Sequence, residues 1–266
     1  MSAPEHLPCA TCGTCCRSYI VPVCGYDIWL INQQQRLSPD QYVIACPQPE
    51  MGFDGLLLES GGQPYGLALD KQGRFAVKQP CVFLMHLADG NVRCGIYADR
   101  PLVCQAYPMS LWSGVVFQGK QTRCPPDSWP VREPQRPHWR ATLHRLHMQF
   151  DLYQAVVTRW NARVTARPGI CFTLHEYFSY VLNVYDRLDA LTTAIGPEAL
   201  AAVLAGWPLP PRRPFDLDTL RRQGANLLWV DYFRQAGAII NSYYPDVPPQ
   251  PLHLLEPAAI PAASCD

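Results

Sequence analysis

The sequence has no excess of charge of either sign. Its 266 residues carry 22 Lys plus Arg and 22 Asp plus Glu, so the formal net charge is zero. A neutral chain gives no global electrostatic reason to expect nucleic acid or an acidic membrane surface as a partner. There is also no run of eighteen apolar residues, so we expect no membrane-spanning helix.

Several sequence motifs and signals are missing as well. The chain has no Walker A loop, no G-x-G-x-x-G turn and no G-x-S-x-G elbow, so nothing in it predicts phosphate binding or serine hydrolysis. The stretch from Met1 to Pro8 has neither the basic region nor the apolar core of a secretion signal. Twelve cysteines in 266 residues are too few for a small disulfide scaffold. We therefore expect a cytoplasmic protein with reduced thiols available to bind metal.

Four cysteines fall within eight residues near the start of the chain. Cys9, Cys12, Cys15 and Cys16 follow the spacing C-x2-C-x2-C-C. Two thiols separated by two residues in a turn point to one side of the backbone, as zinc knuckles and iron–sulfur loops require. The fourth ligand of a ferredoxin-type run is missing, because Cys16 follows Cys15 at once, so a further ligand must come from elsewhere. Since neighbouring side chains diverge, we expect Cys15 and Cys16 to serve different centres, or one of them to be a spectator.

A second group of cysteines lies farther along the chain: Cys81, Cys94, Cys104 and Cys124. Cys81 begins an apolar run, and Cys94 follows a turn signal at residues 89–91, so the two cysteines are predicted to meet across one hairpin. Pro101 favours the start of a short helix that carries Cys104. We expect this group to meet the first one in space and to build one composite site with it.

The eight candidate ligands can be arranged in three ways. They can hold one [4Fe-4S] cluster on four thiols with the others in a second metal site, form two tetrahedral zinc sites, or form one metal site beside buried spectators. The other four cysteines, Cys24, Cys46, Cys171 and Cys265, lack partners at ligand spacing. We expect them to be core or surface thiols.

The ordered set of cysteine motifs resembles a known family. The motifs are Cys9-Ala-Thr-Cys12-Gly13-Thr-Cys15-Cys16-Arg17, Cys81-Val-Phe-Leu84, Cys94-Gly-Ile-Tyr97, Arg100-Pro101, Cys104 and Tyr107-Pro108. Together they resemble the CxxCxxCC or YkgJ-like family of zinc- or iron-chelating domains, over somewhat less than half of the chain. The flagellin lysine N-methylases look like distant members by the same pattern. The resemblance implies metal or cluster binding, but this chain has Gln105 where the family usually has Arg.

Helices are predicted on both sides of the second cysteine group. Tyr26 to Gln35 has an apolar side, whereas glycines between residues 51 and 78 predict a hairpin-like stretch with a turn at 70–73. From Trp139 to Trp160, apolar residues recur every three or four positions and predict a long amphipathic helix. Thr173-Leu-His-Glu176 is a capping box that predicts the start of the next helix.

The rest of the chain supplies prolines, further helices and one histidine pair. We expect a proline-rich connection after Cys124, two more helices from Gly196 and Asp216, and an extended tail. His144, His147 and Asp151 share a helical face, as metal ligands on a helix would, but this pattern favours a solvated polar face.

The sequence therefore predicts an α+β protein. A small, irregular, cysteine-rich metal-binding domain with short strands is expected over residues 1–130, and a mainly helical region with a proline-rich linker and tail over residues 131–266. In one functional hypothesis the cysteines hold an iron–sulfur centre, [4Fe-4S] by the ferredoxin-like spacing, for redox or modification chemistry such as methyl transfer. In the other, they hold structural Zn²⁺ and the helical half is a protein-interaction module. The expected partner or substrate is a protein, not nucleic acid or a membrane.

Overall fold

The computed structural model describes residues 12–47, 55–72, 79–112, 115–118, 122–124 and 136–195. Its helices are α1 (Thr14–Ser18), α2 (Gly25–Gln35), the short 3-10 helix η1 (Pro39–Gln41), α3 (Leu102–Ala106), α4 (Arg136–Thr165) and α5 (Leu174–Ile195). Its strands form three antiparallel pairs: β1 (Val43–Pro47) with β2 (Tyr65–Leu69), β3 (Leu84–His86) with β4 (Val92–Cys94), and β5 (Met109–Trp112) with β6 (Val115–Gln118). Short strands in the N-terminal half and long helices in the C-terminal half confirm the α+β class. Within the described part, no helix has the length and apolarity needed to cross a membrane.

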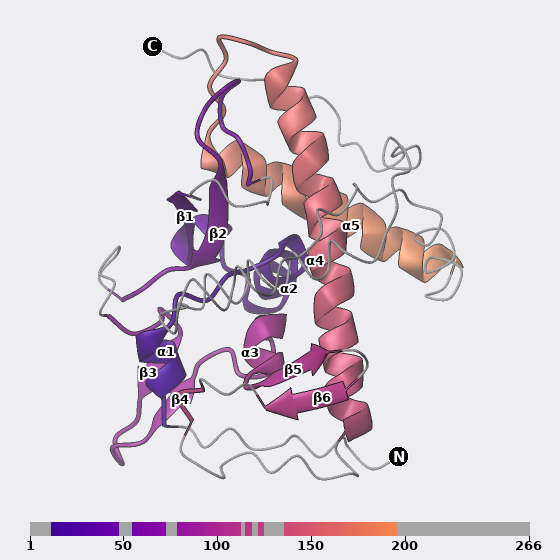
Figure 1. Cartoon of the computed structure of the whole chain (residues 1–266). Helices are drawn as coiled ribbons and strands as arrows, with labels where there is room; N and C mark the ends of the chain where they lie inside the picture. The colour runs from indigo at the N-terminus through magenta and orange to yellow at the C-terminus, as the bar shows by residue number, and fades with distance from the viewer. Residues whose placement is uncertain are drawn as a thin grey trace, which may run out of the picture.

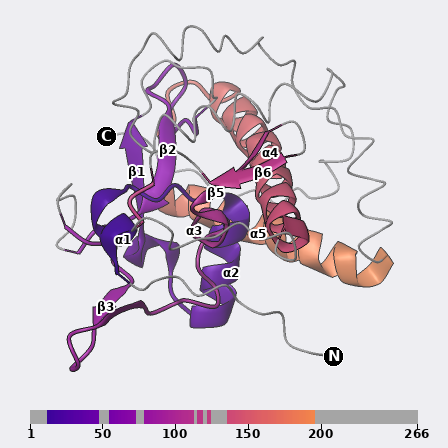
Figure 2. The ribbon, with the colours of Figure 1, turned by 60° about the horizontal axis from the view of Figure 1, so that its bottom comes forward.

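Helix α2 lies near the centre of the view in Figure 1, with β1 and β2 on one side and α4 and α5 on the other. Figure 2 shows the same ribbon with its bottom turned toward the viewer. Its apolar residues Ile28 and Ile31 are fully buried. Gly25, its first residue, allows close approach of α5, because a Cβ at this position would overlap the ring of Tyr185. The helix predicted from Tyr26 to Gln35 is thus confirmed, and packing on both sides stabilises it.

The long helix α4 joins two hydrophobic clusters. Near its C-terminal end, Trp160 packs against Phe172, Tyr177 and Tyr180, with ring centroids 5.1 to 5.3 Å apart, in a core shared with α2, β1 and β2. Near its N-terminal end, α4 packs on α3, β5 and β6 in a second cluster that contains Trp139. The predicted amphipathic helix is confirmed. The helices share these cores with the cysteine-bearing half, and the domain boundary near residue 130 stays a prediction.

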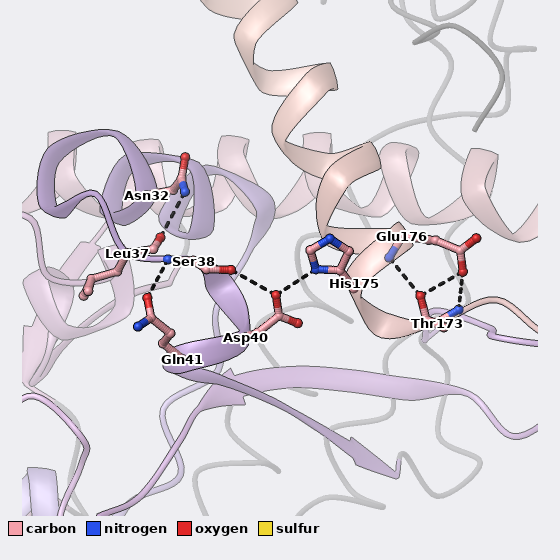
Figure 3. A network of polar contacts seen from close by, with 8 residues as sticks. All are labelled: Asn32, Leu37, Ser38, Asp40, Gln41, Thr173, His175 and Glu176. Atoms are coloured by element: carbon pink, nitrogen blue, oxygen red, sulfur yellow. Dashed lines mark hydrogen bonds and ion pairs between the residues drawn. The ribbon is translucent and has the colours of Figure 1, made fainter. Parts of the chain in front are cut away.

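The capping box predicted at the start of α5 is present. Glu176 Oε2 accepts a hydrogen bond from the backbone N–H of Thr173 at 2.6 Å, and Thr173 Oγ1 accepts one from the N–H of Glu176 at 3.2 Å. Next to this cap, His175 Nδ1 lies 2.9 Å from Asp40 Oδ2, which also accepts a hydrogen bond from Ser38 Oγ (Figure 3). The first turn of α5 is therefore connected to η1 and to the chain that leaves α2.

The strand pairing differs from the prediction for residues 51–78. Strand β2 pairs with β1, which was not predicted, and Val43 lies opposite Leu69 at one end of the ladder. Within the predicted hairpin, Leu56 and Tyr65 form an isolated antiparallel bridge. Periodicity marks a strand but carries no signal for its partner, so the pairing was decided by packing.

Several predictions fall outside the described residues. They concern Cys9, Cys265, the strand returning over residues 74–78, the proline-rich connection after Cys124, the helices from Gly196 and Asp216, and the tail.

Candidate metal centre

Seven of the eight candidate cysteines line one cavity of about 490 Å³. Cys12, Cys15 and Cys16 come from the first group, and Cys81, Cys94, Cys104 and Cys124 come from the second. The eighth, Cys9, lies outside the described residues. The two groups meet in space, as predicted, at the end of the molecule where α1, β3 and β4 lie together (Figure 1). Which of these thiols ligate a metal stays a prediction.

The loop that carries the first group is held against the β3–β4 hairpin. Gly13 has a φ of 66°, the left-handed region that glycine adopts without steric cost. A Cβ at this position would lie only 2.8 Å from Val92 Cγ2 of β4. Three residues on, the carbonyl of Cys16 accepts a hydrogen bond from the N–H of Cys81 at 2.8 Å. The loop therefore contacts the second cysteine group through its backbone as well as through the cavity.

The adjacent thiols of Cys15 and Cys16 do not diverge. Their sulfur atoms lie 3.9 Å apart at the start of the short helix α1. Two thiolates bound to one tetrahedral zinc at about 2.3 Å would have their sulfurs about 3.8 Å apart. The premise that these neighbouring side chains diverge is therefore wrong, whereas the expectation that they serve different centres, or that one is a spectator, stays a prediction.

Cys81 and Cys94 approach the cavity differently from the predicted pairing. In the β3–β4 ladder, Cys94 lies opposite Leu84. Cys81 precedes the hairpin and forms an isolated antiparallel bridge with Lys71. Lys71 is a contact residue of this site that the sequence analysis did not single out. In the sequence, Lys71 follows the apolar run 67–69 and Asp70, and it belongs to no recognisable motif. Nothing in the sequence therefore marked it as part of a site.

Helix α3 carries Cys104, and hydrogen bonds fix its start and the turn before it. At its start, the N–H of Leu102 donates to the buried carboxylate of Asp27 at 2.8 Å. Arg100, just before it, donates to the carbonyl of Tyr97 at 2.8 Å and lies over that ring, 3.9 Å from the centroid. Gln105, where the family usually has Arg, donates to the carbonyl of Arg100 at 2.7 Å. Its role is thus to hold the turn before α3.

Burial and local charge give the thiols different proton affinities. Burial raises the pKa of Cys81 to about 12, and it raises the pKa of Cys104 well above its usual range, with the charge of Cys81 adding to the effect. The pKa of Cys16 is lowered to about 7, chiefly by a hydrogen bond with Cys15 and further by the positive charge of Lys71. Without a cation the deeper thiols keep their protons, so metal binding must release them.

The donor set fits zinc or iron. The described residues that line the cavity include seven thiols and no histidine or carboxylate, and the rest of the wall is apolar or aromatic apart from two arginines. Thiolate is the ligand that structural zinc and iron–sulfur clusters share. In the described part of the chain, no three His, Cys, Asp or Glu side chains are already gathered as a metal site. The thiols would therefore have to move together from the wall to ligate one ion.

Three of the four remaining cysteines lie in the described part of the chain, and none of these three lines the cavity. Cys24 is fully buried before α2, and Cys46 is half-buried on β1, as expected of core and surface thiols. Cys171 is disulfide-bonded, which corrects the expectation of a thiol there. Cys265 lies outside the described residues.

Comparison with known proteins gives one match. Residues 8–126 match the model of the CxxCxxCC family, described as "Putative zinc- or iron-chelating domain". No curated protein and no solved structure matches the chain significantly. The matched segment spans the candidate cysteines from Cys9 to Cys124, whose described members line the cavity. Over residues 8–126 the chain is therefore similar to the CxxCxxCC family of zinc- or iron-chelating domains.

Proposed function

We propose that the cysteine cavity holds iron as a [4Fe-4S] cluster, and that the protein uses this centre in redox or modification chemistry. The observation that carries the proposal is the cavity itself: seven thiols from two distant groups surround about 490 Å³ of space. A single zinc ion with four thiolates at about 2.3 Å forms a closed tetrahedral site and needs no such volume. A cubane needs four thiolates on separated irons, which two groups approaching from different elements can supply.

The chain's own residues define what such a centre could do. Cys12 and Cys15 have the spacing of ferredoxin-type ligands, and Cys104 reaches the same cavity from α3. The wall between the thiols includes Tyr19, Phe83 and other apolar side chains, which limit the access of water. When bound, the cluster would supply one-electron transfer. The cavity would leave room beside it for part of a substrate, and we propose a protein as the class of that substrate or partner.

A second function is favoured by one distance. The 3.9 Å between the sulfurs of Cys15 and Cys16 matches two ligands of one tetrahedral metal better than two ligands of a cubane, which bind different irons. In this alternative the cysteines hold structural Zn²⁺, and α4 and α5 form a protein-interaction module.

Purification in the absence of oxygen tests both functions. For the cluster, we expect brown protein with broad visible absorbance and matching amounts of iron and acid-labile sulfide. Reconstitution of the metal-free protein with iron and sulfide should restore the colour. Colourless protein with stoichiometric zinc that takes up no cluster on reconstitution would show that the zinc alternative is correct.

A further inference from the structure

Lys71 is a positively charged side chain inside the protein. The residue lies just after β2 in the chain and is only 5% exposed. Its backbone is fixed on two sides, since its N–H donates to Asp70 Oδ1 at 2.7 Å and the residue forms a bridge with Cys81. The position of the ammonium group is thus set by the same backbone that places a candidate metal ligand.

The ammonium group contacts the first cysteine loop through its carbonyls. Lys71 Nζ donates to the carbonyl of Cys16 at 3.1 Å and to the carbonyl of Tyr19. The carbonyl of Cys16 also accepts the N–H of Cys81. One carbonyl oxygen therefore connects the first cysteine group, the second cysteine group and the buried cation.

This cation has no carboxylate partner among the described residues. Its side chain donates to the two carbonyls, and no ion pair within the described part of the chain includes it. A buried charge without an opposite charge is costly. The carbonyls of Cys16 and Tyr19 that it contacts belong to residues that line the cavity. The ammonium group therefore lies beside the wall of the candidate metal site.

A metal–thiolate centre has the opposite imbalance. Four thiolates around a divalent metal, or around a [4Fe-4S] core of charge +2, leave two uncompensated negative charges. In a mostly apolar cavity such charge is poorly solvated and is stabilised by nearby cations. Arg93 and Arg100 of the wall are two such cations, and the buried Lys71 behind the first cysteine loop is a third, one without a carboxylate partner among the described residues.

We propose that Lys71 is the internal counter-cation of the metal–thiolate centre, a positioning residue whose fixed charge stabilises the metal-bound state. The inference rests on metal binding as in the proposed function, but it does not depend on whether the metal is iron or zinc. It predicts that charge at this position matters more than hydrogen bonding to the carbonyls.

Three substitutions separate charge from hydrogen bonding. Lys71→Gln removes the charge and keeps an N–H donor, Lys71→Met removes both, and Lys71→Arg keeps both. The matched control is Arg140→Met, which removes one exposed positive charge on α4.

Affinity for the native metal is measured by competition with a chelator, in parallel with chemical unfolding of each metal-free variant. We expect Lys71→Gln and Lys71→Met to bind about 10- to 100-fold more weakly, the range found for residues that support metal ligands. Lys71→Arg and Arg140→Met should stay close to the wild type.

The possible results distinguish failure of the role proposed for Lys71 from failure of the proposed function. If the wild type binds no zinc or iron, both fall. If the wild type binds metal and Lys71→Gln binds it equally well, only the role of Lys71 is overturned. Should Lys71→Met fail to fold, the comparison of Lys71→Gln with Lys71→Arg still decides. For an iron–sulfur centre, Lys71→Gln should also have a lower midpoint potential than Lys71→Arg, because reduction adds negative charge, and an unchanged potential would count against the proposal.

Discussion

The carboxylate of Asp27 accepts a hydrogen bond at 2.8 Å from the backbone N–H of Leu102, a residue 75 positions away. Its other oxygen accepts the N–H of Cys24 at 3.0 Å. The Asp27 side chain, which is 1% exposed, therefore accepts a backbone N–H at the N-terminus of both α2 and α3. Because α3 carries Cys104, this carboxylate connects the central helix to the wall of the cysteine cavity.

Asp27→Ala should destabilise the fold and weaken the metal centre. The substitution leaves the N–H groups of Cys24 and Leu102 buried without a partner, and we expect a loss of about 3 kcal/mol in the free energy of unfolding of the metal-free protein. Metal content should fall as well, because α3 is no longer held. The control is Asp40→Ala, which removes an exposed carboxylate paired with His175 and should cost less than about 1 kcal/mol. Equal losses in the two variants, measured by urea unfolding, would contradict this role for Asp27.

The same carboxylate should make stability depend on pH. Burial raises the pKa of Asp27 above its ordinary value of 3.8, although its two backbone hydrogen bonds oppose the shift. A raised folded pKa means that the folded state binds the proton more tightly, so this contribution is fully present below the unfolded pKa and is lost as pH rises through the folded pKa. The free energy of unfolding of the wild type minus that of Asp27→Asn should therefore fall as pH increases across this range. A difference that grows with pH would show that hydrogen bonding outweighs burial.

Gly13→Ala should cost more than Gly61→Ala. Both glycines have positive φ, 66° and 75°, so both substitutions carry a backbone penalty of about 1 to 2 kcal/mol. Only at Gly13 would the new Cβ also crowd Val92, whereas nothing lies within 4 Å at Gly61. We expect the larger loss of unfolding free energy, and loss of metal, only for Gly13→Ala. If both variants keep their metal and lose the same stability, the packing of this loop on β4 is unimportant.

Cysteine variants should separate the cavity from the rest of the fold. Cys12→Ser and Cys104→Ser each remove a thiol from the cavity wall, and we expect lower metal content and lower soluble yield, because metal-binding energy is also folding energy. Cys46→Ser is the matched control, since Cys46 is half-buried on β1 and does not line the cavity. Elemental analysis of the three purified variants gives the result. The same metal content in all of them would refute the site.

Thiol reactivity should follow the local charge of the metal-free protein. The thiolate is the reactive form, so the Cys16 thiol, with its pKa lowered to about 7, should be alkylated near neutral pH, with a rate that rises as pH increases through about 7. Cys81, with its pKa raised to about 12 by burial, should react far more slowly at the same pH. Timed iodoacetamide labelling followed by peptide mass spectrometry measures both. Faster labelling of Cys81 would contradict the assignment.

Local sequence patterns determined much of this protein. The amphipathic spacing from Trp139 to Trp160 specifies the face of α4, and Thr173 with Glu176 specifies the start of α5. The turn at Asp89 forms as predicted, with the side chain accepting the N–H of Asn91 at 3.0 Å. These features form from neighbours a few residues apart, and the cysteine spacing likewise identified the thiols that now line one cavity.

Tertiary packing decided the rest. The pairing of β1 with β2, the contact of Asp27 with Leu102 and the placement of Lys71 against Cys16 all join residues that are distant along the chain. No periodicity or motif encodes such partners, because they depend on which apolar surfaces are buried together. Even the 3.9 Å approach of the adjacent Cys15 and Cys16 sulfurs is not specified by spacing, because each side chain has several staggered rotamers.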